Sequence, residues 1–287
     1  MPTGWALTWT KRHPATAFTV LALLLSWAAW LPLLAQTQGW VEGSPASALH
    51  LLGSLGPAGA AILVTGATRG RHGLAELARR LTAWRARGRA WAFALVVPPG
   101  LLVVAAIAST LAGGGAPSDV DWSAFGRSEE FASLPLVVFW LANLTFFGFG
   151  EEIGWRGFLQ PELERRRPRV LAANLVAVVW ALWHLPLFGI TPSYRAMPAL
   201  GFVGFAASIW VASWIFAWLL QIGRGSLLVV AVFHAWFDIS TTSPLGPGLL
   251  PTAMGAGTTL IGLLVLRHLL NADQVGHPGP ATERTGS

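Results

Sequence analysis

The stretch that decides the fold is residues 134–160, which read LPLVVFWLANLTFFGFGEEIGWRGFLQ. It exceeds the roughly 20 apolar residues that a membrane-spanning helix needs, and yet it contains Glu151, Glu152 and Arg156. A charged side chain at the centre of a bilayer costs about 3 kcal/mol or more, so such residues usually face one another or a wet cavity. The stretch therefore predicts a transmembrane helix that carries part of a buried polar site.

The composition extends this prediction to the whole chain. Of its 287 residues, 54% are hydrophobic and 11% are charged, whereas a soluble globular protein carries about 25% charged residues. Because this charge is too small to cover a water-facing surface, we expect an all-α integral membrane protein, a polytopic bundle of about eight transmembrane helices. The absence of Cys excludes disulfides, Cys-ligated zinc and thiol chemistry.

Eight segments have the length of a membrane-spanning helix. They are roughly residues 15–36, 46–67, 90–112, 134–160, 170–188, 200–222, 226–242 and 250–270. The seventh is short and polar, so we expect it to pack inside the other helices.

The basic residues fall on alternate connections between these segments. Of the 19 Lys and Arg, 16 lie on one side, Arg127 and Arg195 lie on the other, and Arg156 lies inside the membrane. The positive-inside rule then predicts a multi-pass protein of the cell inner (plasma) membrane with both termini cytoplasmic. The formal net charge of +6 is thus a topological signal and does not indicate nucleic-acid binding.

We expect four regions along the chain. They are residues 1–129 with the N-terminal transmembrane helices, 130–242 as the functional core, 243–270 as the last transmembrane helix, and 271–287 as a disordered cytoplasmic tail. Within the first region, residues 69–89 carry seven Arg and place leucines at helical spacing. This pattern predicts an interfacial amphipathic helix on an anionic leaflet, and the alternative is a solvated basic linker.

Two further apolar segments carry ionisable side chains. His184 lies in residues 170–188, and His234 and Asp238 lie in residues 226–242. With a rise of about 1.5 Å per helical residue, the polar groups of all three segments are about 12–21 Å from the cytoplasmic end of their own segment. We therefore expect a single polar layer built from three helices.

The two neighbouring glutamates differ in their surroundings. Glu152 and Arg156 are four residues apart on one helix and so face each other, whereas Glu151 lies about 100° round the helix. The ion pair occupies Glu152 and leaves Glu151 free to act as a general base. The alternative is an inert buried cluster of ion pairs.

The two histidines have different local settings. His184 precedes a Leu-Pro pair, and because proline disfavours helix at the residue before it, we expect the helix to loosen just after His184. His234 and Asp238 are four residues apart and share one helix face, so the carboxylate can orient the imidazole. Considered alone, the alternative for His184 is a core histidine, and the alternative for His234 and Asp238 is a side-chain pair that stabilises its helix.

These residue types suit the hydrolysis of an amide by activated water. Glu151, assisted by His184, would deprotonate the water, while His234 and Asp238 would stabilise the oxyanion on the peptide carbonyl. In the alternative scheme, His184, His234 and a glutamate form a zinc site with an open position. The chain contains no His-Glu-x-x-His helix.

Three motifs follow one another within residues 130–242. They are Glu-Glu-x-x-x-Arg at 151–156, Trp-x-x-x-His at 180–184 and His-x-x-x-Asp at 234–238. They resemble the motifs Glu-Glu-x-x-x-Arg, Phe-x-x-x-His and His-x-x-x-Asn/Asp of the CAAX protease and bacteriocin-processing (CPBP, or Abi) family of intramembrane proteases. That family includes the eukaryotic CAAX prenyl endopeptidase type II.

The resemblance implies a role for each of the six polar residues. Glu151 matches the catalytic glutamate, His184 the histidine that assists it, His234 and Asp238 the oxyanion side, and Glu152 and Arg156 the ion pair that shapes the site. It also implies a glutamate-type, metal-independent enzyme. Trp180 stands where the family usually has Phe, and Asp238 stands where the prenyl endopeptidases have Asn. The latter, with the Arg- and Ala-rich composition, points to the prokaryotic branch and a bacterial protein.

We therefore expect an intramembrane endopeptidase that hydrolyses a peptide bond of a membrane-associated protein or peptide, lipid-modified proteins included. Its partners would be that substrate and the lipid bilayer, not nucleic acid, and it would need no cofactor unless the zinc scheme holds. One alternative is a non-catalytic membrane protein of bacteriocin immunity or protein localisation on the same scaffold. Another is a proton-coupled transporter, although no inverted repeat is evident.

Overall fold

The computed structural model describes residues 3–43, 47–113, 116–128, 130–243, 245 and 250–276, and every regular element in these residues is helical. The α-helices are α1 (Thr3–Arg12), α2 (Pro14–Thr37), α3 (Ser47–Ser54), α4 (Gly56–Leu81), α5 (Gly88–Ala112), α6 (Leu136–Ala142), α7 (Gly150–Gly154), α8 (Gln160–Glu164), α9 (Arg169–Trp183), α10 (Pro192–Arg195), α11 (Ala199–Ile222), α12 (Leu227–Thr242) and α13 (Leu250–Gly276).

Seven helical stretches of the described chain are long and apolar enough to cross a membrane. They are Pro14–Thr37, Ala48–Leu81, Gly88–Ala112, Leu136–Glu164, Arg169–Gly189, Ala199–Ile222 and Leu250–Asp273. Together with the shorter α12, they correspond one to one to the eight segments predicted from the sequence. The predicted all-α polytopic membrane bundle is therefore confirmed.

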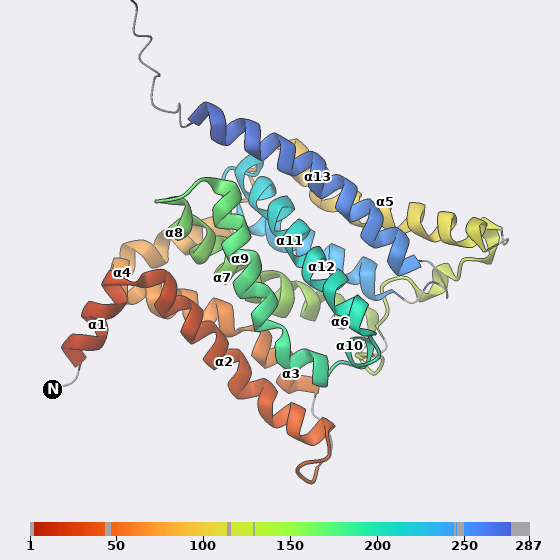
Figure 1. Cartoon of the computed structure of the whole chain (residues 1–287), viewed down its shortest axis with the longest axis horizontal. Coiled ribbons are helices and arrows are strands. Elements are labelled where there is room, and N and C mark those ends of the chain that lie inside the picture. Colours follow the sequence, from red (N-terminus) through yellow and green to blue (C-terminus); the bar gives the residue numbers. More distant parts are fainter. Residues whose placement is uncertain are drawn as a thin grey trace, which may run out of the picture.

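The short helix α12 lies inside the bundle, as its polar sequence predicts. It contacts α5, α11 and the segment Asn143–Phe149, and Leu227, Val229 and Val230 are fully buried. In Figure 1, α5 and α13 lie along one edge of the bundle and α2 and α4 along the opposite edge, with α9 and α11 between them. The central position of α12 carries His234 into the interior.

The stretch from α6 to α8 is not a uniform α-helix. The segments Asn143–Phe149 and Trp155–Leu159 are π-helical and flank the short α7, which carries the two glutamates. A π-helical turn contains more residues than an α-helical turn and is frequent at functional sites. The hydrophobic pattern of the sequence does not predict this widening.

Two glycines allow this stretch to approach its neighbours closely. A Cβ on Gly154 would lie 2.4 Å from Pro57 Cβ in α4, and a Cβ on Gly148 would lie 2.7 Å from the Ala231 carbonyl oxygen in α12. Real Cβ atoms essentially never come within 3.0 Å of such atoms. The backbone on either side of Glu151 is therefore packed directly against α4 and α12.

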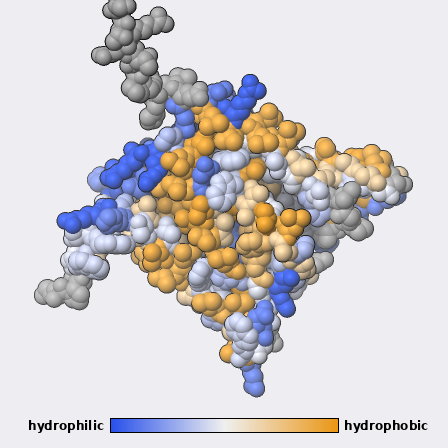
Figure 2. All heavy atoms as spheres, viewed as in Figure 1, coloured by the Kyte–Doolittle hydropathy of each residue, from blue (hydrophilic) through white to orange (hydrophobic). Residues whose placement is uncertain are grey.

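Charged side chains collect at one end of the bundle. Arg69 in α4 pairs with Glu162 in α8 at 2.9 Å, and Asp273 in α13 accepts hydrogen bonds from the backbone N–H groups of Arg169 and Val170 at the start of α9. We call this the basic end; it comprises the arginines of residues 69–89, Arg165–Arg169, Arg224 and Arg267. Figure 2 shows hydrophilic residues along this side and a broad hydrophobic band across the middle.

Two helix boundaries differ from the prediction. Helix α4 passes through a kink at Gly70 (φ 59°) to Leu81, but residues 83–87 are not helical, so only the first part of the predicted helix 69–89 forms. There the carbonyls of Ala83 and Trp84 accept hydrogen bonds from side chains instead of helical N–H groups.

At the other end of the chain, α13 continues to Gly276, beyond the predicted end near residue 270, because Asp273 is bonded to the start of α9. The rest of the predicted disordered tail, residues 277–287, lies outside the described residues.

Candidate active site

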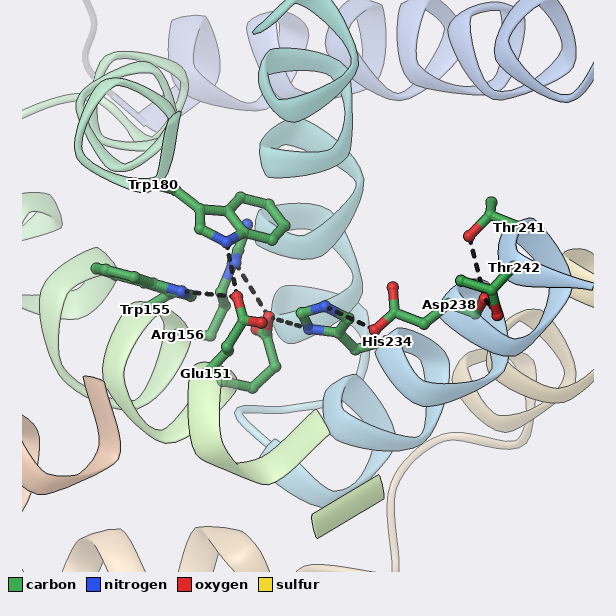
Figure 3. A network of polar contacts seen from close by, with 9 residues as sticks. Glu151, Trp155, Arg156, Trp180, His234, Asp238, Thr241 and Thr242 are labelled. Carbon is green, nitrogen blue, oxygen red and sulfur yellow. Dashed lines mark hydrogen bonds and ion pairs between the residues drawn. The ribbon is translucent and has the colours of Figure 1, made fainter. Parts of the chain in front are cut away.

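Glu152 is the centre of a buried chain of polar side chains. Figure 3 shows its partners Arg156 and His234, with Asp238 beyond His234. Its Oε1 accepts hydrogen bonds from Arg156 Nη1 at 3.1 Å and from His234 Nδ1 at 2.8 Å. His234 Nε2 lies 3.6 Å from Asp238 Oδ2. Because an ionised carboxylate only accepts hydrogen bonds, the proton of this contact is on Nδ1 of the imidazole. The predicted pair of Glu152 and Arg156 is confirmed, and the structure adds His234 as a second partner.

The guanidinium of Arg156 is held between two aromatic rings. Its central carbon lies 4.6 Å from the centre of the Trp180 ring and 4.3 Å from that of the Phe216 ring. Such cation–π contacts stabilise a cation where water is excluded, and the Arg156 side chain is 0% exposed. Arg80 reaches in from the basic end and donates hydrogen bonds to the backbone carbonyls of Arg156 and Gly157. Contacts to the side chain of Arg156 and to the backbone beside it therefore both hold the ion pair in place.

Glu151 has a different environment from Glu152, as helical spacing predicts. Its Oε2 accepts hydrogen bonds from Trp180 Nε1 at 2.7 Å and from Trp155 Nε1 at 3.2 Å. Within the described residues, no Arg, Lys or His side chain pairs with it and no group donates to its Oε1. Glu151 is 4% exposed. It is a buried carboxylate oriented by neutral donors on one oxygen only.

His184 ends helix α9, as predicted from the proline that follows. The chain continues as a 3₁₀ helix over Leu185–Gly189. His184 Nδ1 lies 2.7 Å from the carbonyl oxygen of Trp180, so Nδ1 donates and Nε2 is the free acceptor of the neutral ring. No hydrogen bond joins His184 and Glu151 among the described residues, but Trp180 bonds to both, through its indole N–H to Glu151 and through its carbonyl oxygen to His184.

Asp238 is the most exposed of the six predicted residues. Its side chain is 29% exposed, while that of His234 is 6% exposed. Figure 3 shows it at the far side of His234 from Glu151. Glu152, Arg156, His234 and Asp238 thus form one connected group. Glu151 is joined to this group through the Trp180 side chain, which contacts Arg156. The sixth residue, His184, is linked to it only through the Trp180 backbone carbonyl.

Three aromatic residues contact the polar groups of this site, although the sequence analysis assigned none of them a role there. Trp155 is four residues after Glu151, so helical spacing could have identified it as a donor. The indole of Trp180 approaches from another helix, and the sequence indicates only that an aromatic residue stands there. Phe216 lies in the apolar stretch of α11, where nothing in the sequence distinguishes it from the other apolar residues as part of a site.

The zinc alternative needs His184, His234 and a glutamate to converge. Among the residues that the structure describes, no three His, Asp or Glu side chains are grouped so that they could hold a metal ion. The side chains present do not fit a metal site of this kind.

Comparison with known proteins places this group of residues in a family. Residues 133–240 match the family model described as Type II CAAX prenyl endopeptidase Rce1-like. The chain is also similar to the protein named CAAX prenyl protease 2 of Methanococcus maripaludis, with 29% identity over 138 residues. That match covers 44% of this chain and 46% of the relative, so it spans under half of either protein. The family match, residues 133–240, contains all six predicted residues, and the resemblance seen in the motifs is confirmed. Residues 133–240 form a domain of the Rce1-like type II CAAX prenyl endopeptidase family.

Proposed function

We propose that this chain is an intramembrane endopeptidase in which Glu151 activates water. The observation that carries the proposal is the contrast between the two glutamates. Glu152 is neutralised by Arg156 and His234, whereas Glu151 is held by two indoles and keeps one oxygen without a donor among the described residues. A carboxylate that is oriented but not ion-paired suits a general base.

In the proposed reaction, Glu151 Oε1 takes a proton from a water molecule. The water oxygen bonds to the carbonyl carbon of the peptide, and the electrons of the C=O bond move to the carbonyl oxygen. Glu151 then returns the proton to the amide nitrogen. The electrons on the oxyanion re-form the C=O bond as the C–N bond breaks, which yields an acid and an amine. His184 Nε2, the free acceptor of its ring, orients the water.

We place the developing oxyanion near His234. The bond from Nδ1 to Glu152 fixes the orientation of this ring, and in its protonated form the ring donates from Nε2. Donors that are already oriented stabilise an oxyanion in a low-dielectric site better than mobile water does. Asp238, 3.6 Å from Nε2, orients the ring.

The setting of the reaction is also a proposal. The positive-inside pattern favours a plasma membrane protein with its basic end and both termini in the cytoplasm. We infer that residues 130–242 are the catalytic core and that the substrate is a membrane-associated protein or peptide cleaved from that side. The relative is named a CAAX prenyl protease, and from that name we carry over peptidase activity alone.

The decisive experiment compares membrane peptides from cells that make the wild-type chain or Glu151→Gln. Glutamine keeps the size of the side chain and can still accept from both indoles, but it cannot take a proton from water. Since general acid–base groups contribute about 10²–10⁴-fold, we expect cleavage products to fall by at least about 10²-fold and their precursors to accumulate.

Glu76→Gln is the matched control, because Glu76 is an exposed glutamate on α4 that pairs only with Arg79 among the described residues. Unchanged peptide patterns in the Glu151→Gln cells would refute the proposal. They would leave a non-catalytic scaffold or a proton-coupled transporter, which a pH-sensitive dye in proteoliposomes would distinguish.

A further inference from the structure

A groove separate from the six polar residues opens between α5, α11 and α13. It has a volume of about 410 Å³, and its walls include Phe93, Trp218, Ile261 and Leu264, with Arg89 and His268 as its polar members. Ligand pockets have volumes of roughly 300–1,000 Å³. All three helices that form the groove are long and apolar enough to cross a membrane, and Leu264 on its wall is 63% exposed. We therefore expect the groove to open toward the bilayer.

The polar and apolar parts of the groove are separated along its length. Arg89 is the second residue of α5, and His268 lies in the last third of α13. Phe93 and Ile261 lie about 6 Å and 10 Å further from the basic end, at about 1.5 Å per residue. The groove therefore has cationic or ionisable groups at the level of the basic end and an apolar wall beneath them.

This arrangement matches the two parts of a phospholipid. An acyl chain suits the apolar wall, and a phosphate suits Arg89, because Arg and His side chains donate hydrogen bonds to phosphate oxygens. The described ion pairs at the basic end involve other arginines, including Arg69, Arg79 and Arg165, and none involves Arg89. Arg87, the residue that precedes α5, adds positive charge near Arg89, which favours an anionic headgroup over a zwitterionic one.

The groove also leads toward the candidate active site. Phe93 and Ile261 line a second, narrower cavity, which is bounded further in by Phe233 and Phe237. Phe233 and Phe237 are the sequence neighbours of His234 and Asp238. The Phe233 ring lies 5.2 Å from that of Phe216, which contacts the His234 ring at 5.1 Å.

We propose that the α5/α11/α13 groove binds an anionic phospholipid, with its phosphate at Arg89 and His268 and an acyl chain along Phe93, Ile261 and Leu264. The site lies beside the candidate active site and shares none of its six polar residues. The proposal concerns binding, so it stands or falls independently of the proposed peptidase activity.

Native mass spectrometry of the detergent-purified full chain tests this proposal with phosphatidylglycerol and phosphatidylcholine of identical acyl chains. We expect the wild type to retain phosphatidylglycerol preferentially. Arg89→Gln removes one basic contact with the headgroup, so we expect about fivefold weaker binding of phosphatidylglycerol. Leu264→Trp fills the groove and should abolish retention of both lipids.

Each variant has a neighbour as a matched control. Arg85→Gln removes a positive charge whose guanidinium instead lies 4.9 Å from the Trp84 ring. Leu263→Trp adds the same bulk to α13 at a residue that is 52% exposed and outside the groove, while Leu264 is 63% exposed. Both substituted leucines are exposed, so neither variant disturbs the core.

The proposal is supported if both controls retain phosphatidylglycerol, Arg89→Gln binds it more weakly and Leu264→Trp loses it. Equal retention of the two lipids by the wild type would overturn it, because the groove would then accept any acyl chain. It would also be overturned if Arg85→Gln weakened binding as much as Arg89→Gln, since the basic end would then act only through its total charge.

Discussion

Replacing Trp180 with phenylalanine isolates one hydrogen bond of the candidate active site. The indole of Trp180 donates to Glu151 Oε2 at 2.7 Å, the shorter of the two indole contacts to that carboxylate. Phenylalanine removes the donor but keeps an aromatic ring where Trp180 stacks on Arg156, 4.6 Å from its guanidinium carbon. The change therefore acts mainly on the orientation of Glu151.

The size of the effect follows from the geometry. A hydrogen bond to a charged group contributes about 1.5–3 kcal/mol. Trp155 still donates at 3.2 Å, so the carboxylate keeps one contact and we take a loss of about 2 kcal/mol, which corresponds to roughly a 30-fold fall in cleavage rate. The assay is the cleavage rate in proteoliposomes of a substrate identified by the membrane-peptide comparison, with the unfolding temperature measured in parallel.

Trp183→Phe is the matched control on the same helix. Its buried indole donates to Ser26 Oγ at 2.6 Å and makes no hydrogen bond to Glu151. Both variants lose one indole donor, and we expect each to lose about 1 kcal/mol of stability, but only Trp180→Phe should lose the additional rate. A Trp180→Phe enzyme within twofold of wild type would refute the reasoning, and so would an equal loss in Trp183→Phe. The family motif has Phe at the position of Trp180, so this substitution tests whether the indole donor matters in this chain.

Three further predictions concern stability and topology. Arg156→Met should destabilise the protein by about 3–5 kcal/mol, because it leaves a buried carboxylate without its cation; an unfolding temperature close to that of wild type would contradict this. Gly154→Ala should cost about 1–3 kcal/mol of stability through overpacking against α4. Gly204→Ala should cost little, because an added Cβ there would meet nothing within 4 Å; equal unfolding temperatures of the two variants would contradict the close approach at Gly154. The chain contains no Cys, so Arg127→Cys and Arg167→Cys each provide a single label site. A membrane-impermeant maleimide should reach only the former from outside intact cells, and the reverse pattern would invert the proposed topology.

The sequence by itself determined the features that depend on neighbouring residues and on length. The eight spanning segments follow from apolar runs measured against the bilayer thickness. The pair of Glu152 and Arg156 follows from a four-residue spacing, and the helix end at His184 follows from the proline two residues later. Each of these depends on local geometry, which is the same wherever the helix lies in the bundle.

Only the tertiary structure decided which groups meet across helices. The contact of His234 with Glu152 joins residues 82 apart, and that of Trp180 with Glu151 joins residues 29 apart. Both depend on how far each helix is rotated about its axis and how closely the axes approach. In this chain the approach of α12 to the segment before α7 requires Gly148, and the rotation depends on the π-helical segments on either side of α7. Apolar residues surround each helix on nearly all sides in a membrane bundle, so the hydrophobic pattern does not specify that rotation.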